Sequence, residues 1–268
     1  MTSIAKYQRA FALGMQQALE YRVNFLLHLT SAFFQIFIQL FLWTAVFRST
    51  GGGTMFGYTY QQMMLYTVIA GLLNRLVRTG FESEVAEDIK SGGLSKYIVR
   101  PVGHFTYRLS VFLGLKSAQT GLVSLLLLAA AIAVARLTGL PILASQVAWF
   151  VPAFILAFVI NFVLFYAVSA IGFWLSDIGF FFEAVRIVFI LLSGGIFPLS
   201  VFGRAERFLN WLPFRYTINF PVDVLTGRIA GRDALVGIAA QLLWILVLFG
   251  ISRVVWARGM RKFVAVGG

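Results

Sequence analysis

Long apolar runs constrain the fold of this chain more than any other feature of its sequence. The longest cover residues 109–135, 147–175 and 234–256. A helix needs about 20 consecutive apolar residues to cross the hydrocarbon core of a bilayer, so each run is long enough. Charged residues make up only 12% of the chain, against about 25% in ordinary soluble domains. A soluble fold of 268 residues could not cover so much apolar surface, and the sequence therefore predicts an all-α polytopic membrane protein.

The whole chain, residues 1–268, is expected to form a single transmembrane domain with six membrane-spanning helices. These are predicted at residues 24–47, 61–77, 109–135, 147–175, 184–195 and 234–256. Ahead of them, within residues 1–23, the stretch 3–22 carries one apolar stripe: Ile4, Tyr7, Phe11, Met15 and Leu19. That pattern predicts an amphipathic helix lying in the membrane interface. A simple extension of the first span is the alternative.

Lysine and arginine residues set the expected orientation. Fourteen of them lie in the N-terminal stretch, the connection between spans two and three, and the C-terminal tail, against seven on the other side. Short cytoplasmic loops carry the excess of these residues, so both termini are expected in the cytoplasm. The net charge of +12 therefore indicates a membrane surface rather than nucleic acid. The chain has no cysteine, which excludes disulfides, and no removable signal peptide is expected at its N-terminus.

A polar insert, FESEVAEDIKSGGLSKYIVRPVGHFTYR, occupies residues 81–108 between two of the predicted spans. Phe81, Val85 and Ile89 recur every four residues and so share one face of a helix. The insert also holds four of the chain's ten acidic residues: Glu82, Glu84, Glu87 and Asp88. We expect a short helix at the membrane surface that is offered to a partner protein. Its apolar face would point toward the membrane or a partner groove, and Glu84, Glu87 and Asp88 would point toward the partner or water. An ordinary solvated loop is the alternative.

Two local signals bound that insert. Ser91-Gly92-Gly93 is expected to end the helix, because glycine reaches the left-handed cap conformation at little cost. The Arg100-Pro101 pair is expected to force an extended residue before the next apolar run.

The segment 193–231 is too apolar for a plain loop and too interrupted for a span. Gly194, Gly195 and Pro198 break the helix of the fifth span, and Pro213 and Pro221 interrupt the rest of the segment. Broken backbone at membrane depth is tolerated only where protein or water covers it. We therefore predict a re-entrant segment in the outer leaflet that caps a cavity. A helix lying on the membrane surface is the alternative.

Groups that carry covalent chemistry are sparse. The only histidines are His28 and His104, which without cysteine cannot supply a zinc site of known spacing. No G-x-x-x-x-G-K-[ST] phosphate-binding loop is present, so any ATP must be hydrolysed by a separate subunit. We expect no catalytic residue, no metal site and no cofactor in this chain. Three polar side chains at membrane depth are expected to form hydrogen bonds between helices: Gln35, Gln39 and Asn161.

Four stretches together resemble the permease subunits of ABC-2 type ATP-binding-cassette exporters. They read EVAEDIKSGGLSKYIVRPV at residues 84–102, SGGIFPL at 193–199, LNWLPFRY at 209–216 and NFPVDVLTG at 219–227. The six spans and the N-terminal amphipathic helix agree with the same family, and the resemblance covers nearly the whole chain.

The resemblance implies a partnership and a location. Two ATPase subunits would bind ATP and magnesium below the membrane, and a second permease would pair with this one as a homodimer or heterodimer. Residues 82–90 would be the coupling helix seated in a groove of the ATPase, with Glu82, Glu84, Val85, Glu87, Asp88 and Ile89 as its contact residues. Residues 193–231 would close the exit side. The complex would lie in the bacterial inner membrane among its lipids and export a drug, antibiotic, lipid or glycan.

Three other classes fit the sequence less well. A secondary transporter driven by an ion gradient would carry charges at mid-span, where the sequence has almost none. A membrane-embedded enzyme would need clustered acids or histidines at one membrane face, and only Asp177 and Glu183 cluster, in a loop. A non-transporting scaffold would not associate with an ATPase.

Overall fold

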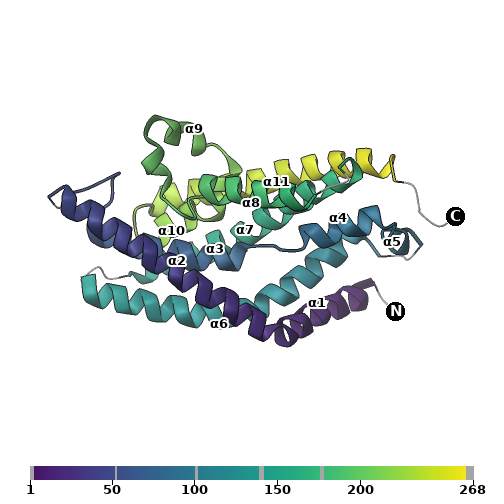
Figure 1. The fold of residues 1–268 in the computed structure, drawn as a ribbon, viewed down its shortest axis with the longest axis horizontal. Helices are drawn as coiled ribbons and strands as arrows, with labels where there is room; N and C mark the ends of the chain where they lie inside the picture. Colours follow the sequence, from purple (N-terminus) through teal and green to yellow (C-terminus); the bar gives the residue numbers. More distant parts are fainter. Residues whose placement is uncertain (1–2, 52, 100–101, 139–141, 176–177, 264–268) are drawn as a thin grey trace.

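A computed structural model of the chain describes residues 3–51, 53–99, 102–138, 142–175 and 178–263, and the secondary structure of these residues is helical apart from one isolated bridge between Met55 and Tyr58 (Figure 1). Two sequence predictions fall outside the described residues: the extended residue at Arg100-Pro101, and the placement of Asp177 in a loop.

The helices follow in the order α1 Ser3–Glu20, α2 Arg22–Ser49, α3 Tyr60–Val77, α4 Glu82–Lys90, α5 Ser95–Val99, α6 His104–Thr138, α7 Ala144–Ser169, α8 Gly179–Leu192, α9 Glu206–Leu209, α10 Asn219–Leu225 and α11 Gly231–Met260. Three 3-10 turns join them: η1 Ala170–Phe173, η2 Leu199–Ala205 and η3 Pro213–Thr217. Helices lie over all six segments predicted to span the membrane. Among the described residues, Ala144–Phe173 and Gly231–Met260 are long and apolar enough to cross a bilayer.

Two helix boundaries differ from the sequence prediction. The prediction that Glu183 lies in a loop is wrong, because α8 already begins at Gly179. Glu183 is thereby placed one turn from Arg186, and their side chains pair at 2.6 Å (Oε1 to Nη1) as helix neighbours do. At the other connection, α6 begins at His104, and the short helix α5 precedes it without having been expected.

Helix α3 forms the centre of the fold. Its N-terminus is held by a capping box, in which the Thr59 hydroxyl accepts from the Gln62 amide and the Gln62 side chain accepts from the Thr59 amide. Ile69, Leu73 and Leu76 are fully buried against neighbouring helices. The helix contacts α2, α6, α7 and α10. The second predicted span is the least apolar in sequence, yet it is the one enclosed by the others.

Helix α1 packs closely along the first half of α6. A Cβ on Gly14 would collide with the carbonyl oxygen of Val111, and one on Gly114 would collide with that of Phe11. Small residues permit such close backbone approach between membrane helices. Much of the predicted apolar stripe points away from α6, with Ile4 70% and Leu19 62% exposed. The amphipathic helix predicted for residues 3–22 is therefore present, and its apolar side is free to meet lipid.

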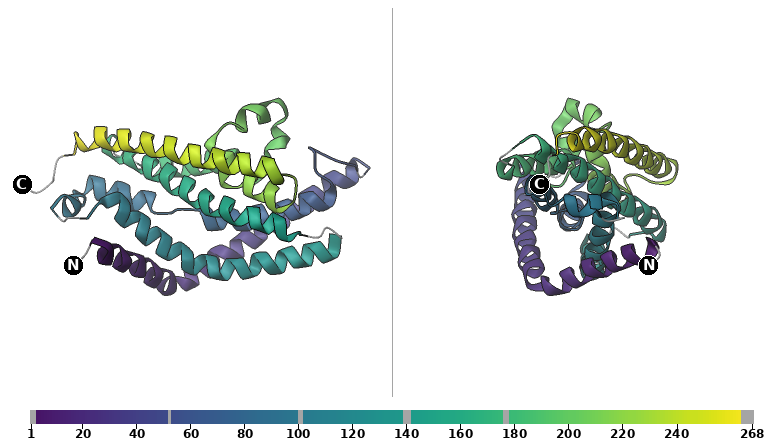
Figure 2. Two further views of the ribbon diagram at one scale, coloured as in Figure 1. Left: turned by 180° about the vertical axis from the view of Figure 1, so that it is seen from behind. Right: turned by 90° about the vertical axis from the view of Figure 1, so that its right-hand side faces the viewer.

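The first described turn of α1 and the last turn of α11 share one end of the bundle with α4. In Figure 1 the start of α1, the end of α11 and helices α4 and α5 lie together on the right, and Figure 2 shows the same grouping from behind. Helices α9 and α10 and the turn between α2 and α3 lie toward the opposite end. The acidic insert and the 193–231 segment are thus separated along the long axis of the molecule.

Polar side chains inside the bundle join helices, as expected for Asn161. Its amide on α7 donates to the carbonyl of Val77 on α3. Gln241 on α11 makes a similar link, donating to the carbonyls of Ala153 and Tyr216 at 2.9 Å each. These bonds fix α7 against α3 and α11 against α7 and η3.

Candidate functional site

The acidic insert forms helix α4 with the predicted bounds. Glu82 and Glu84 lie in its first turn, where carboxylates complement the partial positive charge of a helix N-terminus. The helix ends at Lys90 with Ser91 as its C-cap, and Gly92 then adopts a positive φ of 76°. The chain folds back so that the Leu94 amide donates to the Asp88 carbonyl at 3.0 Å. The predicted Gly-Gly stop is therefore confirmed.

The apolar face of α4 packs inside the permease fold itself. Val85 is fully buried and Ile89 is 5% exposed, in a cluster with Leu94 that the side chains of Phe173 and Trp256 cover. The expectation that these residues face the membrane or a partner groove is wrong. The amphipathic pattern is real, but η1 and the end of α11 supply the covering surface from within the same chain.

Glu82 is also buried, and its carboxylate is held by α8. The Arg186 guanidinium donates to Oε1 of Glu82 through Nε at 2.8 Å and Nη2 at 2.5 Å. The Thr79 hydroxyl donates to the other oxygen at 3.0 Å. The Glu82 side chain has no exposed surface, whereas Arg186 keeps 20%. Glu82, which the resemblance names as a contact residue of the coupling helix, is thus covered by its own chain and ties α4 to α8.

A second set of ion pairs ties α4 to α5 and α6. Arg108 donates to Asp88 Oδ2 at 2.6 Å and to Glu84 Oε2 at 2.9 Å, and Lys96 donates to Asp88 Oδ1 at 3.0 Å. Burial raises the pKa of the Asp88 carboxyl, but the hydrogen bonds from Lys96 and Arg108 lower it more, so this pKa lies below its ordinary value. Asp88 is therefore ionised at neutral pH and anchored to α6.

Three side chains remain exposed along α4 itself: Ser83, Glu84 and Glu87. The Glu84 side chain is 69% exposed despite its bond to Arg108. Of the acids predicted to face a partner or water, Glu84 and Glu87 are exposed, whereas Asp88 is only partly accessible. The surface that α4 offers is small, polar and acidic.

The broken segment after α8 begins at the two predicted glycines. Gly194 has a positive φ of 80°, and a Cβ there would lie 2.6 Å from the Tyr66 hydroxyl. That hydroxyl donates to the Gly194 carbonyl at 2.7 Å, joining the turn to α3. A Cβ on Gly195 would lie 2.8 Å from Ile190. Both positions therefore need glycine, and the predicted break of the fifth span is confirmed as a local structure.

The predicted prolines all stand at starts of short helices. Pro198 precedes η2, Pro213 opens η3, and Pro221 lies in the first turn of α10. Proline has no backbone N–H group, and at a helix start no hydrogen bond is lost, because the amides there have no partner within the helix. Their placement divides the segment into short pieces rather than one surface helix.

A buried polar network that the sequence did not reveal holds these pieces together. Asp223 accepts from the Tyr58 hydroxyl at 2.8 Å and from the Asn219 amide, and it pairs with Arg228 at 3.3 Å. The Arg228 guanidinium also lies 3.6 Å from the centre of the Tyr58 ring. Asn219 in turn accepts from the Leu199 amide at 2.9 Å. The sequence signal for this network was Asp223, a lone acid in the apolar stretch NFPVDVLTG.

The comparisons with known proteins agree with this geometry. No curated protein and no solved structure matches the chain. A family model does match, over residues 33–267, and its description is ABC-2 family transporter protein. That match covers α3 to α11 and most of α2, including the acidic insert and the broken segment. The chain therefore belongs to the ABC-2 family of transporter proteins, as a membrane-embedded permease.

Proposed function

We propose that this permease is the membrane subunit of an ATP-driven exporter that moves a hydrophobic or amphipathic molecule out of the cytoplasm or the inner leaflet. Family membership supports association with ATPase subunits, which would bind the ATP and magnesium. Two ATPases would serve two permeases, the second being either a copy of this chain or a related one. The chain itself would carry out no covalent chemistry.

The proposed placement has one permease domain over residues 1–268, with six spans in a bacterial inner membrane. Both termini and the coupling segment, residues 81–108, would face the cytoplasm. Residues 1–23 would lie in the inner interface, and residues 193–231 would re-enter the outer leaflet as a cap. The grouping of the start of α1 and the end of α11 with α4 at one end of the bundle supports this orientation (Figure 1).

The attachment of α4 to several helices is the observation that carries the proposal. Val85 and Ile89 pack on η1 and α11, Glu82 pairs with Arg186 on α8, and Asp88 pairs with Arg108 on α6. When ATP closes the ATPase dimer, a push on the exposed side of α4 reaches these helices through short, buried contacts. The path between the two permeases then switches from inward-open to outward-open.

The test is co-expression with a P-loop ATPase encoded beside this chain, followed by purification and hydrolysis in nanodiscs. Replacing the exposed Glu87 by glutamine should cost under ~1 kcal/mol of binding free energy, as rim charges do. Glu87→Lys should cost more, since it would meet a basic surface with like charge. Asp233→Lys, an exposed reversal in the first turn of α11, is the control and should bind like the parent.

The energy source is tested separately. Inside-out vesicles that hold the complex should accumulate an amphipathic dye when given ATP and magnesium, and a protonophore should leave the uptake unchanged. Uptake that needs a proton or sodium gradient and ignores ATP would instead assign the chain to secondary transport.

A further inference from the structure

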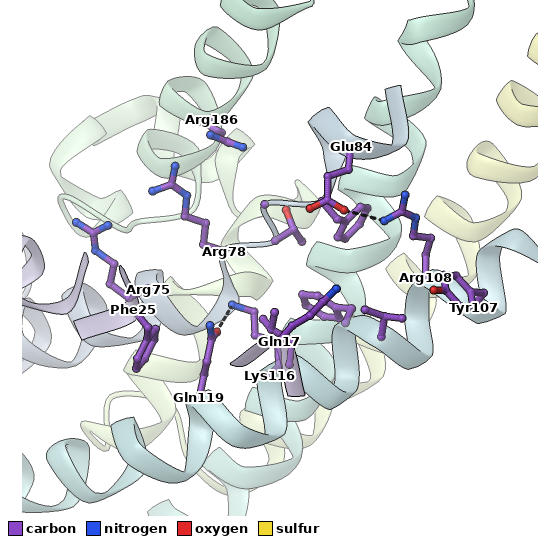
Figure 3. A pocket seen from close by; sticks show the side chains of 16 residues that line it. Gln17, Phe25, Arg75, Arg78, Glu84, Tyr107, Arg108, Lys116, Gln119 and Arg186 are labelled. Atoms are coloured by element: carbon purple, nitrogen blue, oxygen red, sulfur yellow. Dashed lines mark hydrogen bonds and ion pairs between the residues drawn. The ribbon is translucent and has the colours of Figure 1, made fainter. Parts of the chain in front are cut away.

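A cavity of about 460 Å³ opens where α3, α4, α6 and α8 come together (Figure 3). Its size falls within the roughly 300–1,000 Å³ of sites that hold small molecules. Figure 3 shows the labelled side chains of Arg75, Arg78 and Arg186 on one side of the cavity and Lys116 with Gln119 below them. The same three arginines also line a second cavity of about 220 Å³. The larger space is therefore bounded by basic groups from three different helices and a connecting segment.

The lining carries an excess of positive charge. Two of its five cations are neutralised within the fold, because Arg186 pairs with Glu82 and Glu183 while Arg108 pairs with Glu84 and Asp88. In the part of the chain that the structure describes, no carboxylate pairs with the other three, which we call the basic triad: Arg75, Arg78 and Lys116. Arg75 donates to the Ser31 hydroxyl at 3.1 Å, which satisfies a donor without offsetting its charge.

Within the basic triad, the position of Lys116 is not explained by the general preference for lysines on the cytoplasmic side. The positive-inside rule accounts for basic residues that reach water at the membrane boundary. Lys116 is only 6% exposed, and its ammonium donates to the uncharged Gln119 amide oxygen at 3.1 Å. A buried ammonium loses its hydration, so it keeps its charge only when an anion or several hydrogen bonds replace that water. The cavity beside it is the space in which an anion can lie.

Much of the rest of the wall is apolar, although Gln17, Thr79, Tyr107 and Glu84, which pairs with Arg108, also line the cavity. Phe25, Phe81, Val111 and Leu115 line it, and α2 runs from it with exposed phenylalanines, among them Phe34 at 72% and Phe41 at 74%. A fully hydrated ion makes no favourable contact with such apolar side chains. A molecule with an anionic head and a hydrocarbon part can satisfy both the basic triad and the apolar surface.

We propose that this cavity is an anion site that takes the phosphate headgroup of an amphiphilic molecule at the membrane boundary. Arginine donates to phosphate oxygens through paired N–H groups, and lysine serves as a compact charge beside them. The headgroup would come from a membrane phospholipid or from a transported amphiphile. The site does not require ATP-driven export, so binding measured without an ATPase separates this inference from the proposed function.

The experiment titrates the delipidated full chain in detergent with dioctanoyl phosphatidylglycerol, and calorimetry and native mass spectrometry give affinity and stoichiometry. We expect one tightly bound lipid per chain. Arg78→Gln and Lys116→Gln should each weaken binding roughly tenfold, the loss expected when a charge-assisted hydrogen bond is removed. The matched control is Arg258→Gln, which removes an exposed arginine in the last turn of α11, and its affinity should equal that of the parent. Arg78 is exposed, so its replacement leaves folding intact.

Two further probes identify the source of the anion. Dioctanoyl phosphatidylcholine differs by a neutralising choline and should bind at least tenfold more weakly. Inorganic phosphate lacks the apolar part and should also bind weakly; phosphate that binds as tightly as the lipid, with the same dependence on Arg78 and Lys116, would keep the anion site but place its ligand in solution. Equal affinity of both variants and the parent for phosphatidylglycerol would overturn the proposal.

Discussion

Replacing Arg186 by glutamine tests how α4 is fastened to the rest of the permease. The Arg186 side chain makes two hydrogen bonds to Glu82, at 2.8 and 2.5 Å, and one to Glu183 at 2.6 Å. The substitution leaves the Glu82 carboxylate buried with only the Thr79 hydroxyl as a partner. Removing one partner of a buried ion pair costs about 3–5 kcal/mol, because the other charge stays in a poorly solvated place.

The reciprocal change should cost less. Glu82→Gln leaves Arg186 20% exposed and still paired with Glu183, so we expect a loss of about 1–3 kcal/mol, in the range for a hydrogen bond to a charged group. The double variant should be more stable than Arg186→Gln alone, since it leaves no buried carboxylate. The double variant should therefore lose less stability than the sum of the losses of the two single variants.

The assay is reversible unfolding of the purified permease in mixed micelles, with Arg258→Gln as a control that should stay within about 0.5 kcal/mol of the parent. If Arg186→Gln unfolds like the parent, or if Glu82→Gln is the worse of the two, the buried attachment of α4 to α8 is not what stabilises this end of the fold. In the assembled complex, Arg186→Gln should also reduce transport more than ATP hydrolysis.

Three other predictions rest on single contacts. Gly194→Ala should destabilise the fold by more than the ~1–2 kcal/mol of a left-handed residue, because its Cβ also meets Tyr66. The control in the same unfolding assay is Gly51→Ala, which has a φ of 74° and open space around it and should show the backbone cost alone. Equal losses of stability at the two positions would contradict the contact with Tyr66. The pKa of Asp88 in the folded state lies below its unfolded value near 3.9, so the stability that Asp88 contributes is present above that pH and is lost as pH falls through the folded pKa. Asp88→Asn should remove this pH-dependent part of the folding free energy. Acid unfolding that circular dichroism finds unchanged in the variant would contradict the prediction. Asp223→Asn should destabilise by more than about 1 kcal/mol, and the loss should not add to that of Arg228→Gln in a double-mutant cycle.

Features decided by neighbours in sequence were predictable. The bounds of α4 result from its apolar period and the Ser-Gly-Gly stop, and the break after α8 results from Gly194-Gly195 and Pro198. In each case a few adjacent residues restrict the backbone whatever packs around them. The apolar runs likewise predicted where the long helices lie.

Features decided by distant residues were not predictable. The sequence shows that Val85 and Ile89 share a face, but not that η1 and α11 cover it. Glu82 looks like any surface acid, because its partner Arg186 lies 104 residues away. The same limit hid the partners of Asp223, and Gly14 gave no sign that it meets α6.

The claim that α4 is the contact with the ATPase can be tested directly, because the chain contains no cysteine. Single cysteines at the exposed Ser83 and Glu87 on α4 are compared with single cysteines at the exposed Thr54 and Arg207. Thr54 lies in the turn between α2 and α3 and Arg207 lies in α9, two elements found toward the opposite end of the bundle (Figure 1). With the assembled complex in membrane vesicles and a short bifunctional thiol–amine reagent, Ser83→Cys and Glu87→Cys should form a permease–ATPase product, whereas Thr54→Cys and Arg207→Cys should form none. An ATPase product from position 54 or 207, or its absence from both α4 positions in a complex that still co-purifies, would contradict the account.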